Sequence, residues 1–122
     1  MNPAGDDGGK GTGREGELLA REYLEELGFE IVEMNYRYGH GEIDIVAREG
    51  AVLVFCEVKM RKNDRFGPPE YAITPRKQRQ IRRIAEGYFF DHEIREQETR
   101  FDVVAIRMRG QECELHHIRN AF

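Results

Sequence analysis

The most apolar stretch of the chain runs Val52-Leu53-Val54-Phe55-Cys56-Glu57-Val58-Lys59. Its β-branched and aromatic residues are typical of a strand, and its near-continuous apolar character favours a central position in a sheet. Glu57 and Lys59 interrupt this character. Residues two apart on a strand point to the same face, so the two charged side chains share one face of the predicted strand.

The residues just upstream predict a hairpin with this strand. Glu42 to Arg48 is expected to form a strand with Ile43 and Ile45 on one face and Glu42, Asp44 and Val46 on the other. A tight turn at Glu49-Gly50 joins the two strands. Pairing about that turn places Leu53 near Arg48 or Ala47 and brings Glu57 close to Asp44.

Two amphipathic helices are expected. Thr12 and Glu15 have the spacing of a capping box, which predicts a helix that starts near Gly13, and Gly28 stands where the C′ glycine just past the helix end is expected. Its apolar stripe is Ala20, Tyr23, Leu24 and Leu27. Thr74 and Pro75 predict the N-cap and first turn of a second helix that runs to about Phe90. Its core stripe is Ile81, Ile84, Ala85 and Tyr88.

The remaining segments complete an α/β fold. Phe29 to Met34 alternates as a strand does, Asn35 to Gly41 is expected to be a polar connection, and Arg61 to Ile73 a loop. Strands at 101–108 and 112–118 meet at a turn at Arg109-Gly110. The order α-β-β-β-α-β-β predicts a mixed central sheet flanked by helices, with the third and fourth strands parallel across the second helix. Residues 1–12 are expected to be a flexible glycine-rich tail, and 13–122 a single domain.

Composition excludes several classes of protein. The start of the chain does not resemble a signal peptide, and the longest apolar run, residues 51–56, is too short to span a membrane. Two cysteines do not suggest a disulfide framework, and their spacing is not that of a zinc site. We therefore expect a cytoplasmic protein without a membrane partner.

Asp44, Glu57 and Lys59 form the main chemical signal. Two carboxylates close together raise each other's pKa, and a divalent cation relieves the repulsion. Mg²⁺ prefers carboxylate oxygens, Mn²⁺ is the expected substitute, and such a cation can activate water for attack on a phosphodiester. Lys59 could hold or deprotonate that water, or stabilise the transition state. The alternative is an ion pair of Lys59 with one of the carboxylates on an edge strand.

Glu17 extends this constellation. It lies within the inward stripe of the first predicted helix, next to Gly13 and Gly16, which would allow a close approach of a backbone or a ligand. It could bind a second metal ion, or a water molecule that is held by the first metal ion. Alternatively, it is a carboxylate that favours the helix dipole at the margin of the core.

Basic residues concentrate in one segment of an acidic chain. The net charge is −4, yet residues 59–83 hold nine basic residues against two acidic ones, a balance of +7 that leaves −11 for the rest. Such a chain can present a basic face to phosphates. The expected nucleic-acid contacts are Arg37, Arg76, Lys77, Arg79, Arg82 and Arg83. Lys77 lies on the apolar side of its helix and could instead reach the site, and ordinary solubility is the alternative for the arginines.

A series of short motifs resembles the bacterial YraN-like family. In order, they are Gly13-x-x-Gly16-Glu17, Asn35-Tyr36-Arg37, Gly41-Glu42-Ile43-Asp44, Phe55-x-Glu57-Val58-Lys59, Phe66-Gly67-x-Pro69-Glu70, Lys77-Gln78, Arg100-Phe101-Asp102 and Asn120-Ala121-Phe122. The resemblance extends from about Gly13 to Phe122, although Cys56 and Met60 depart from the family's usual valine and threonine.

That family is similar to archaeal Holliday-junction resolvases and to the wider PD-(D/E)xK nucleases. The resemblance implies a restriction-endonuclease-like core with Glu17, Asp44, Glu57 and Lys59 at the active-site positions. It also implies the backbone carbonyl of Val58 as a metal ligand, DNA rather than RNA as the favoured substrate, and a homodimer as one option.

Three functions are therefore in competition. The first is a metal-dependent endonuclease acting on nucleic acid, including branched DNA. The second is a nucleic-acid-binding module that keeps the nuclease fold without cleaving. The third is an interaction protein whose basic helix docks on an acidic partner.

Overall fold

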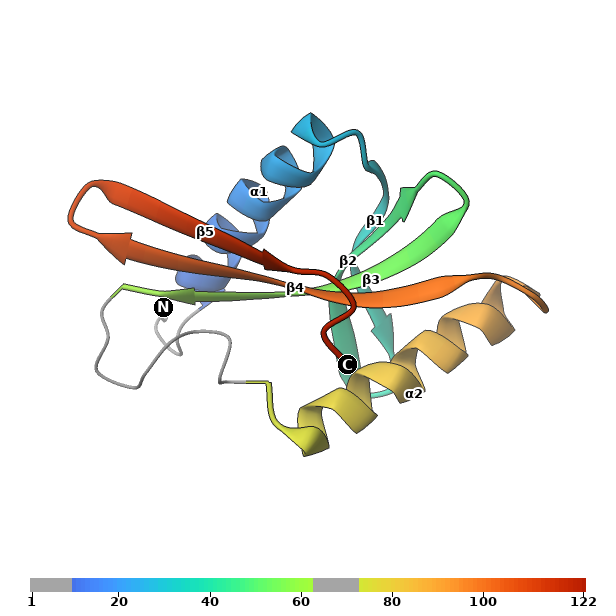
Figure 1. Ribbon diagram of the computed structural model, residues 1–122. Helices are drawn as coiled ribbons and strands as arrows, with labels where there is room; N and C mark the ends of the chain where they lie inside the picture. The colour runs from blue at the N-terminus through green and yellow to red at the C-terminus, as the bar shows by residue number, and fades with distance from the viewer. Residues whose placement is uncertain (1–9, 63–72) are drawn as a thin grey trace.

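The computed structural model describes residues 10–62 and 73–122, and only the backbone for residues 10–12. It is an α/β structure with one five-stranded sheet in the order β1-β2-β3-β4-β5. Helices α1 and α2 cover opposite faces of this sheet (Figure 1). This arrangement confirms the predicted element order and is consistent with a restriction-endonuclease-like fold. The elements are α1 (Lys10–Glu26), β1 (Glu30–Tyr38), β2 (Gly41–Glu49), β3 (Val52–Arg61), α2 (Pro75–Asp91), β4 (Thr99–Arg109) and β5 (Glu112–Ile118).

Strand β3 is central, as its apolar sequence predicts. It pairs antiparallel with β2 and parallel with β4. Leu53 lies opposite Arg48, in agreement with the predicted hairpin register, although the turn itself falls at Gly50-Ala51. The parallel pairing confirms the expected crossover through α2.

The sheet separates two apolar clusters. The cluster beneath α1 is built around Ala20, Leu24, Cys56 and Ile106. The cluster beneath α2 includes the four residues of the predicted stripe together with Phe55. Side chains of β3 therefore alternate between the two sides, and the face that carries Phe55 also carries Glu57, Lys59 and Arg61.

Helix α2 begins and faces the sheet as predicted. Thr74 has extended backbone angles, and its side chain accepts a hydrogen bond from Lys77 N at 3.1 Å. Pro75 occupies the first turn, where its missing N–H is not needed. The buried stripe turns the first-turn residue Lys77 toward the sheet.

The predicted start of α1 is wrong, but its predicted end is confirmed, because Gly28 is the C′ glycine: Gly28 N donates to Glu25 O and Phe29 N donates to Leu24 O, both at 3.0 Å. The helix begins at Lys10 rather than near Gly13, so Thr12 is not its N-cap. Capping-box spacing specifies two residue types only, and it also occurs inside helices. Leu27 is 48% exposed and lies beyond the last helical residue, because the chain turns away at Gly28, where φ is +98°. Residues 1–9 of the predicted tail lie outside the described residues.

The predicted polar connection from Asn35 to Gly41 is also wrong. Strand β1 continues to Tyr38, and the turn is limited to Gly39 and His40. Tyr36 accounts for the difference, because its ring is buried against Tyr88 and its hydroxyl donates to Asp91 at 2.6 Å. A tertiary contact thus extends a strand that local composition would end.

Part of the predicted loop, residues 63–72, also lies outside the described residues. Within the described chain, neither helix is long and apolar enough to cross a membrane.

Candidate metal centre

The site lies where the sheet opens. The β2–β3 ladder ends at the pair Ile45–Cys56, whereas β1–β2 pairing continues to Gly41 and β3–β4 pairing continues to Arg61. Figure 1 shows β2 turning away from β3 and β4 beyond this point. The opening leaves strand backbone without a β-ladder partner, which makes room for side chains between the two halves of the sheet.

The opening also corrects the predicted faces of β2. Ile45 packs in the cluster under α1, whereas Ile43 packs in the cluster under α2, so the two do not share a face. Strict alternation holds only while a strand stays in its ladders, and β2 leaves its ladder with β3 at Asp44, between these two residues. Gly41 permits this course, because a Cβ at that position would lie 2.5 Å from Ile84 Cδ1.

Asp44 replaces the missing ladder bond. Its Oδ2 accepts a hydrogen bond from Val58 N at 2.8 Å. The N–H and C=O of one strand residue point to the same edge, so the Val58 carbonyl also faces the opening. Burial, followed by the charge of Glu57, raises the pKa of Asp44 to about 7, and the bond from Val58 opposes this shift. Asp44 and Glu57 therefore come together as the hairpin register predicted.

Glu57 is the deepest charged group of the opening. Its side chain is only 5% exposed, and its Oε2 lies 3.4 Å from Lys77 Nζ. Its Oε1 is buried and has no hydrogen-bond partner among the described residues. A buried carboxylate oxygen in this state needs a proton shared with Asp44 or a cation to satisfy it.

Glu17 reaches the same place from the opposite face of the sheet. Gly16 lets α1 approach β3 closely, because a Cβ there would lie 3.2 Å from Met60, whereas Gly13 has open space around it. Burial raises the pKa of Glu17 to about 7, with a further rise from the charge of Asp44 and an opposing hydrogen bond from Asn35.

Glu42 and Asn35 belong to the site although we did not predict them there. Carboxylate oxygens of Glu17, Glu42 and Asp44 lie within 4.8 Å of one another. Asn35 Nδ2 donates to Glu17 Oε1 at 2.9 Å and to Glu42 Oε2 at 2.8 Å. The i, i+2 spacing of Glu42 and Asp44 was a usable signal. The contribution of Asn35 depends on a φ of +55° that its sequence position does not reveal.

The donor set fits a divalent cation. The carboxylates of Glu17, Glu42 and Asp44 gather at the opening, Glu57 lies beside Asp44, and one Glu57 oxygen has no hydrogen-bond partner within residues 10–62 and 73–122. Hard cations such as Mg²⁺ and Mn²⁺ prefer such oxygen ligands, and the cluster lacks the sulfur and imidazole that favour zinc. The residues that could hold the ion are Glu17, Glu42, Asp44, Glu57 and Val58.

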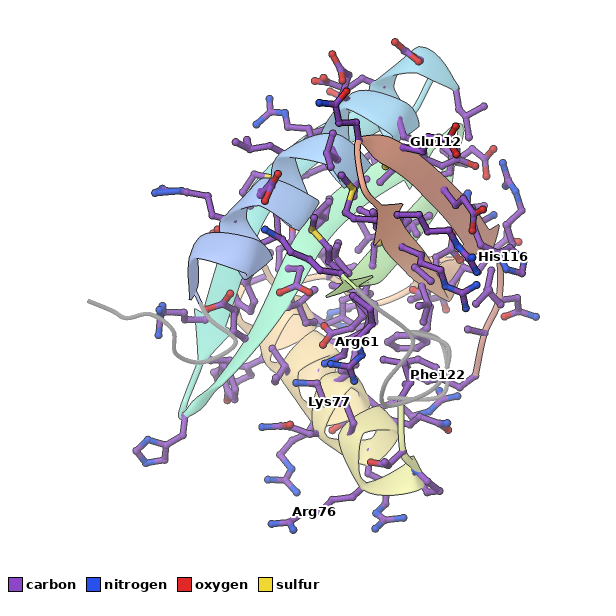
Figure 2. All side chains as sticks on the ribbon, turned by 90° about the vertical axis from the view of Figure 1, so that its left-hand side faces the viewer. Arg61, Arg76, Lys77, Glu112, His116 and Phe122 are labelled. Atoms are coloured by element: carbon purple, nitrogen blue, oxygen red, sulfur yellow. The ribbon has the colours of Figure 1, made fainter. Side chains whose placement is uncertain are left out.

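Basic side chains lie on the α2 side of the centre. Lys59 lies on the same face of β3 as Glu57, is half-buried, and forms no ion pair within the described residues. The first turns of α2 form a groove of about 670 Å³ lined by Thr74, Arg76, Lys77, Arg79, Gln80 and Arg83. Figure 2 shows Lys77 directed toward the sheet, on the side where Arg61 lies, and Arg76 directed away from it.

Two predicted nucleic-acid contacts lie apart from this groove. The Arg82 guanidinium lies 4.8 Å from the centre of the Phe101 ring and 5.5 Å from that of Phe122, which ties α2 to β4 and to the end of the chain. Arg37 pairs with Glu42 at 3.4 Å on the β1 side of the centre.

The raised pKa of Asp44 predicts a pH-dependent effect on stability. Its proton is held more tightly in the folded chain than in the unfolded one, where the pKa is near 3.8. Without a cation, folding stability contributed by this group therefore falls as pH rises from about 4 to about 7. Asp44→Asn, which mimics the protonated form, should stabilise the cation-free protein at pH 8 by about 1–3 kcal/mol and have little effect at pH 4.

Urea unfolding in EDTA at both pH values measures this difference. Glu25→Gln, an exposed change on α1, is the control and should have little effect at either pH. A stability difference for Asp44→Asn that is the same at pH 4 and pH 8 would contradict the electrostatic account of this group.

Known proteins resemble this chain over nearly its full length. The model of the uncharacterised protein family UPF0102 matches residues 16–106. A UPF0102 protein of Syntrophus aciditrophicus is 44% identical over 111 residues, which cover 91% of this chain and 87% of the relative. One from Geotalea daltonii is 44% identical over 123 residues, which cover 100% of this chain and 97% of the relative. One from Geobacter metallireducens is 45% identical over 113 residues, covering 93% of each chain.

Proposed function

The chain belongs to uncharacterised protein family UPF0102, and from the geometry of its carboxylate centre we propose that it is a divalent-metal-dependent endonuclease. Its substrate would be the phosphodiester bonds of nucleic acid, with DNA favoured over RNA. The observation that carries the proposal is the proximity of half-buried Asp44 to buried Glu57 at the sheet opening, where one Glu57 oxygen has no hydrogen-bond partner within the described part of the chain and a cationic groove lies alongside.

Each part of the site has a task in this reaction. A divalent cation held by Asp44 and Glu57 would supply Lewis acidity at the scissile phosphate and an acidified water. Lys59, on the same face as Glu57, orients the attacking water or neutralises the charge that develops on the phosphate. The groove on α2 holds the backbone through its arginines, which suit bidentate phosphate contacts, and through the N-terminal end of the helix.

The chemistry of the surroundings supports nucleic acid over a protein partner. A surface that only docks an acidic protein has no use for several carboxylates gathered in a sheet opening next to the basic groove. Repulsion among those carboxylates costs stability, whereas a cation placed between them and a phosphate satisfies both.

A cleavage panel tests the proposal. Purified protein is incubated with labelled four-way junction, duplex and single-stranded DNA and with duplex RNA, in Mg²⁺, in Mn²⁺ and in EDTA. We expect strand cleavage of at least one DNA substrate that requires the cation and is absent from Asp44→Asn. Binding without cleavage in every cation would instead favour the non-cleaving nucleic-acid-binding module, and absence of binding at low salt would favour a protein partner.

The groove gives a prediction for binding. Replacing Arg79 and Arg83 together with alanine should weaken binding to all sequences alike and reduce the magnitude of the slope of log K against log salt by about two. Fluorescence anisotropy with two unrelated duplexes over a range of salt concentrations measures both quantities. Arg21→Ala, on the other face of the sheet, is the control, and an unchanged slope in the double variant would move the binding surface elsewhere.

A further inference from the structure

Lys77 occupies a position between two anion sites. It comes from the first turn of α2, whose cap at Thr74 fixes the start of the helix. Its Nζ lies 3.4 Å from Glu57 Oε2, and its side chain is 32% exposed whereas that of Glu57 is 5% exposed. The ammonium therefore lies at the boundary between the buried carboxylate and solvent.

The same residue forms part of the wall of the cationic groove. Arg76, Arg79 and Arg83 line that groove with it, but none of these arginines pairs with Glu57 within the described residues. Lys77 alone in this set faces both the carboxylate centre and the place where a phosphate would enter. A lysine suits such a position, because its flexible stem lets one charge move between partners a few ångströms apart.

We propose that Lys77 couples cation binding at Glu57 to phosphate binding in the groove. The inference rests on the proposed function and adds a positioning role for Lys77, whose ammonium exchanges between Glu57 and a phosphate. Without a divalent cation, Lys77 pairs with the carboxylate charge at Glu57, as it does in this structure. With the cation bound, that charge is already neutralised, and the ammonium pairs instead with a phosphate of the nucleic acid.

Thermodynamic reciprocity gives this arrangement two measurable consequences. Because Lys77 competes with the cation for Glu57, removing the ammonium should tighten cation binding in the absence of nucleic acid. Because the ammonium becomes available to phosphate only when the cation is bound, its contribution to nucleic-acid binding should appear only in the presence of the cation. A residue that merely supports the fold would produce neither effect.

Calorimetric titration of Ca²⁺ into the wild type, Lys77→Met and Arg79→Met tests the first consequence. Methionine keeps most of the aliphatic stem and removes the charge. We expect Lys77→Met to bind Ca²⁺ about two- to fivefold more tightly than the wild type, as expected for loss of one partly exposed ion pair. Arg79→Met removes the same charge from the groove without touching Glu57 and should leave the Ca²⁺ affinity nearly unchanged.

The second consequence is tested by fluorescence anisotropy with a labelled duplex DNA. The measurement is made in EDTA and in Ca²⁺ over a range of salt concentrations. Lys77→Met should have the wild-type salt slope in EDTA and a slope smaller by about one in Ca²⁺. For Arg79→Met, the salt slope should be smaller by about one under both conditions. Lys77→Gln provides the same comparison if the methionine variant does not fold.

The outcomes separate this inference from the proposed function. If the wild type binds Ca²⁺ and the Lys77 variants match it in both cation affinity and salt slope, the coupling role is refuted while the metal centre stands. If the wild type binds no divalent cation, the proposed function fails and the coupling role fails with it.

Discussion

Replacement of Lys59 with alanine is expected to slow strand cleavage by about two to three orders of magnitude. Lys59 lies on the face of β3 that carries Glu57, one residue beyond the Val58 carbonyl that faces the sheet opening. Its charge is free of ion pairs within the described residues, so it remains available to act on the attacking water or the transition-state phosphate. Loss of such a group removes stabilisation that appears mainly in the transition state.

Nucleic-acid affinity should change little in the same variant, because Lys59 is one charge among many basic residues near the groove. Single-turnover cleavage and a binding titration, both in Mg²⁺, measure the two effects separately. Lys62→Ala is a matched control, since that side chain follows β3, is 59% exposed and pairs with Glu15 of α1, the helix on the face of the sheet opposite α2. A Lys59→Ala protein that cuts as fast as the wild type would refute the catalytic role.

Replacement of Asp102 with alanine is expected to lower the free energy of unfolding by about 3–5 kcal/mol, a large share of the stability of a small domain. Asp102 is fully buried and connects three segments of the chain. Arg100 donates to both of its oxygens at 2.8 and 3.0 Å, His117 Nε2 lies 2.8 Å away, and Asn120 N donates at 3.0 Å.

These contacts dominate the electrostatics of the carboxylate. Burial alone would raise the pKa of Asp102, but the hydrogen bonds from His117, Arg100 and the Asn120 backbone outweigh burial and lower the pKa to about 2. Alanine would leave the Arg100 and His117 side chains without this partner, and it would remove the bond from Asn120 N, which together with the bond from Ala121 N to Phe101 O holds this segment against β4.

Urea unfolding at pH 7 measures the loss. Glu114→Ala, which removes a carboxylate that is 57% exposed and pairs with Arg109, should cost no more than about 1 kcal/mol. A cost for Asp102→Ala as small as that of the control would show that the buried network contributes specificity rather than stability.

The sequence was sufficient where local patterns and the final packing agree. The register of the β2–β3 hairpin follows from an apolar strand and a short turn, and it brought Asp44 to Glu57 without knowledge of the rest of the sheet. Helix α2 was predicted equally well, because Thr74 and Pro75 signal its start and a regular apolar stripe fixes its orientation. The inward direction of Lys77 follows from the same stripe.

The parts that sequence reasoning missed depend on contacts between distant segments. Strand β1 extends through Asn35 because Tyr36 packs against α2, and a polar stretch alone gives no sign of that packing. The opening between β2 and β3 places Ile43 and Ile45 on opposite faces of the sheet rather than on one, since the alternation rule assumes an unbroken ladder. Glu42 and Asn35 join the site through this same opening.

Binding of Mn²⁺, measured by calorimetric titration, tests the carboxylate centre most directly. At pH 8 both Glu17 and Asp44 are ionised, since the pKa of each is about 7. The wild type should then bind Mn²⁺ saturably, bind it more weakly at pH 6 because protons compete for the same oxygens, and lose binding in Asp44→Asn. A wild type that shows no saturable binding at millimolar Mn²⁺, or an Asp44→Asn protein that binds as tightly as the wild type, would contradict a metal centre at the sheet opening.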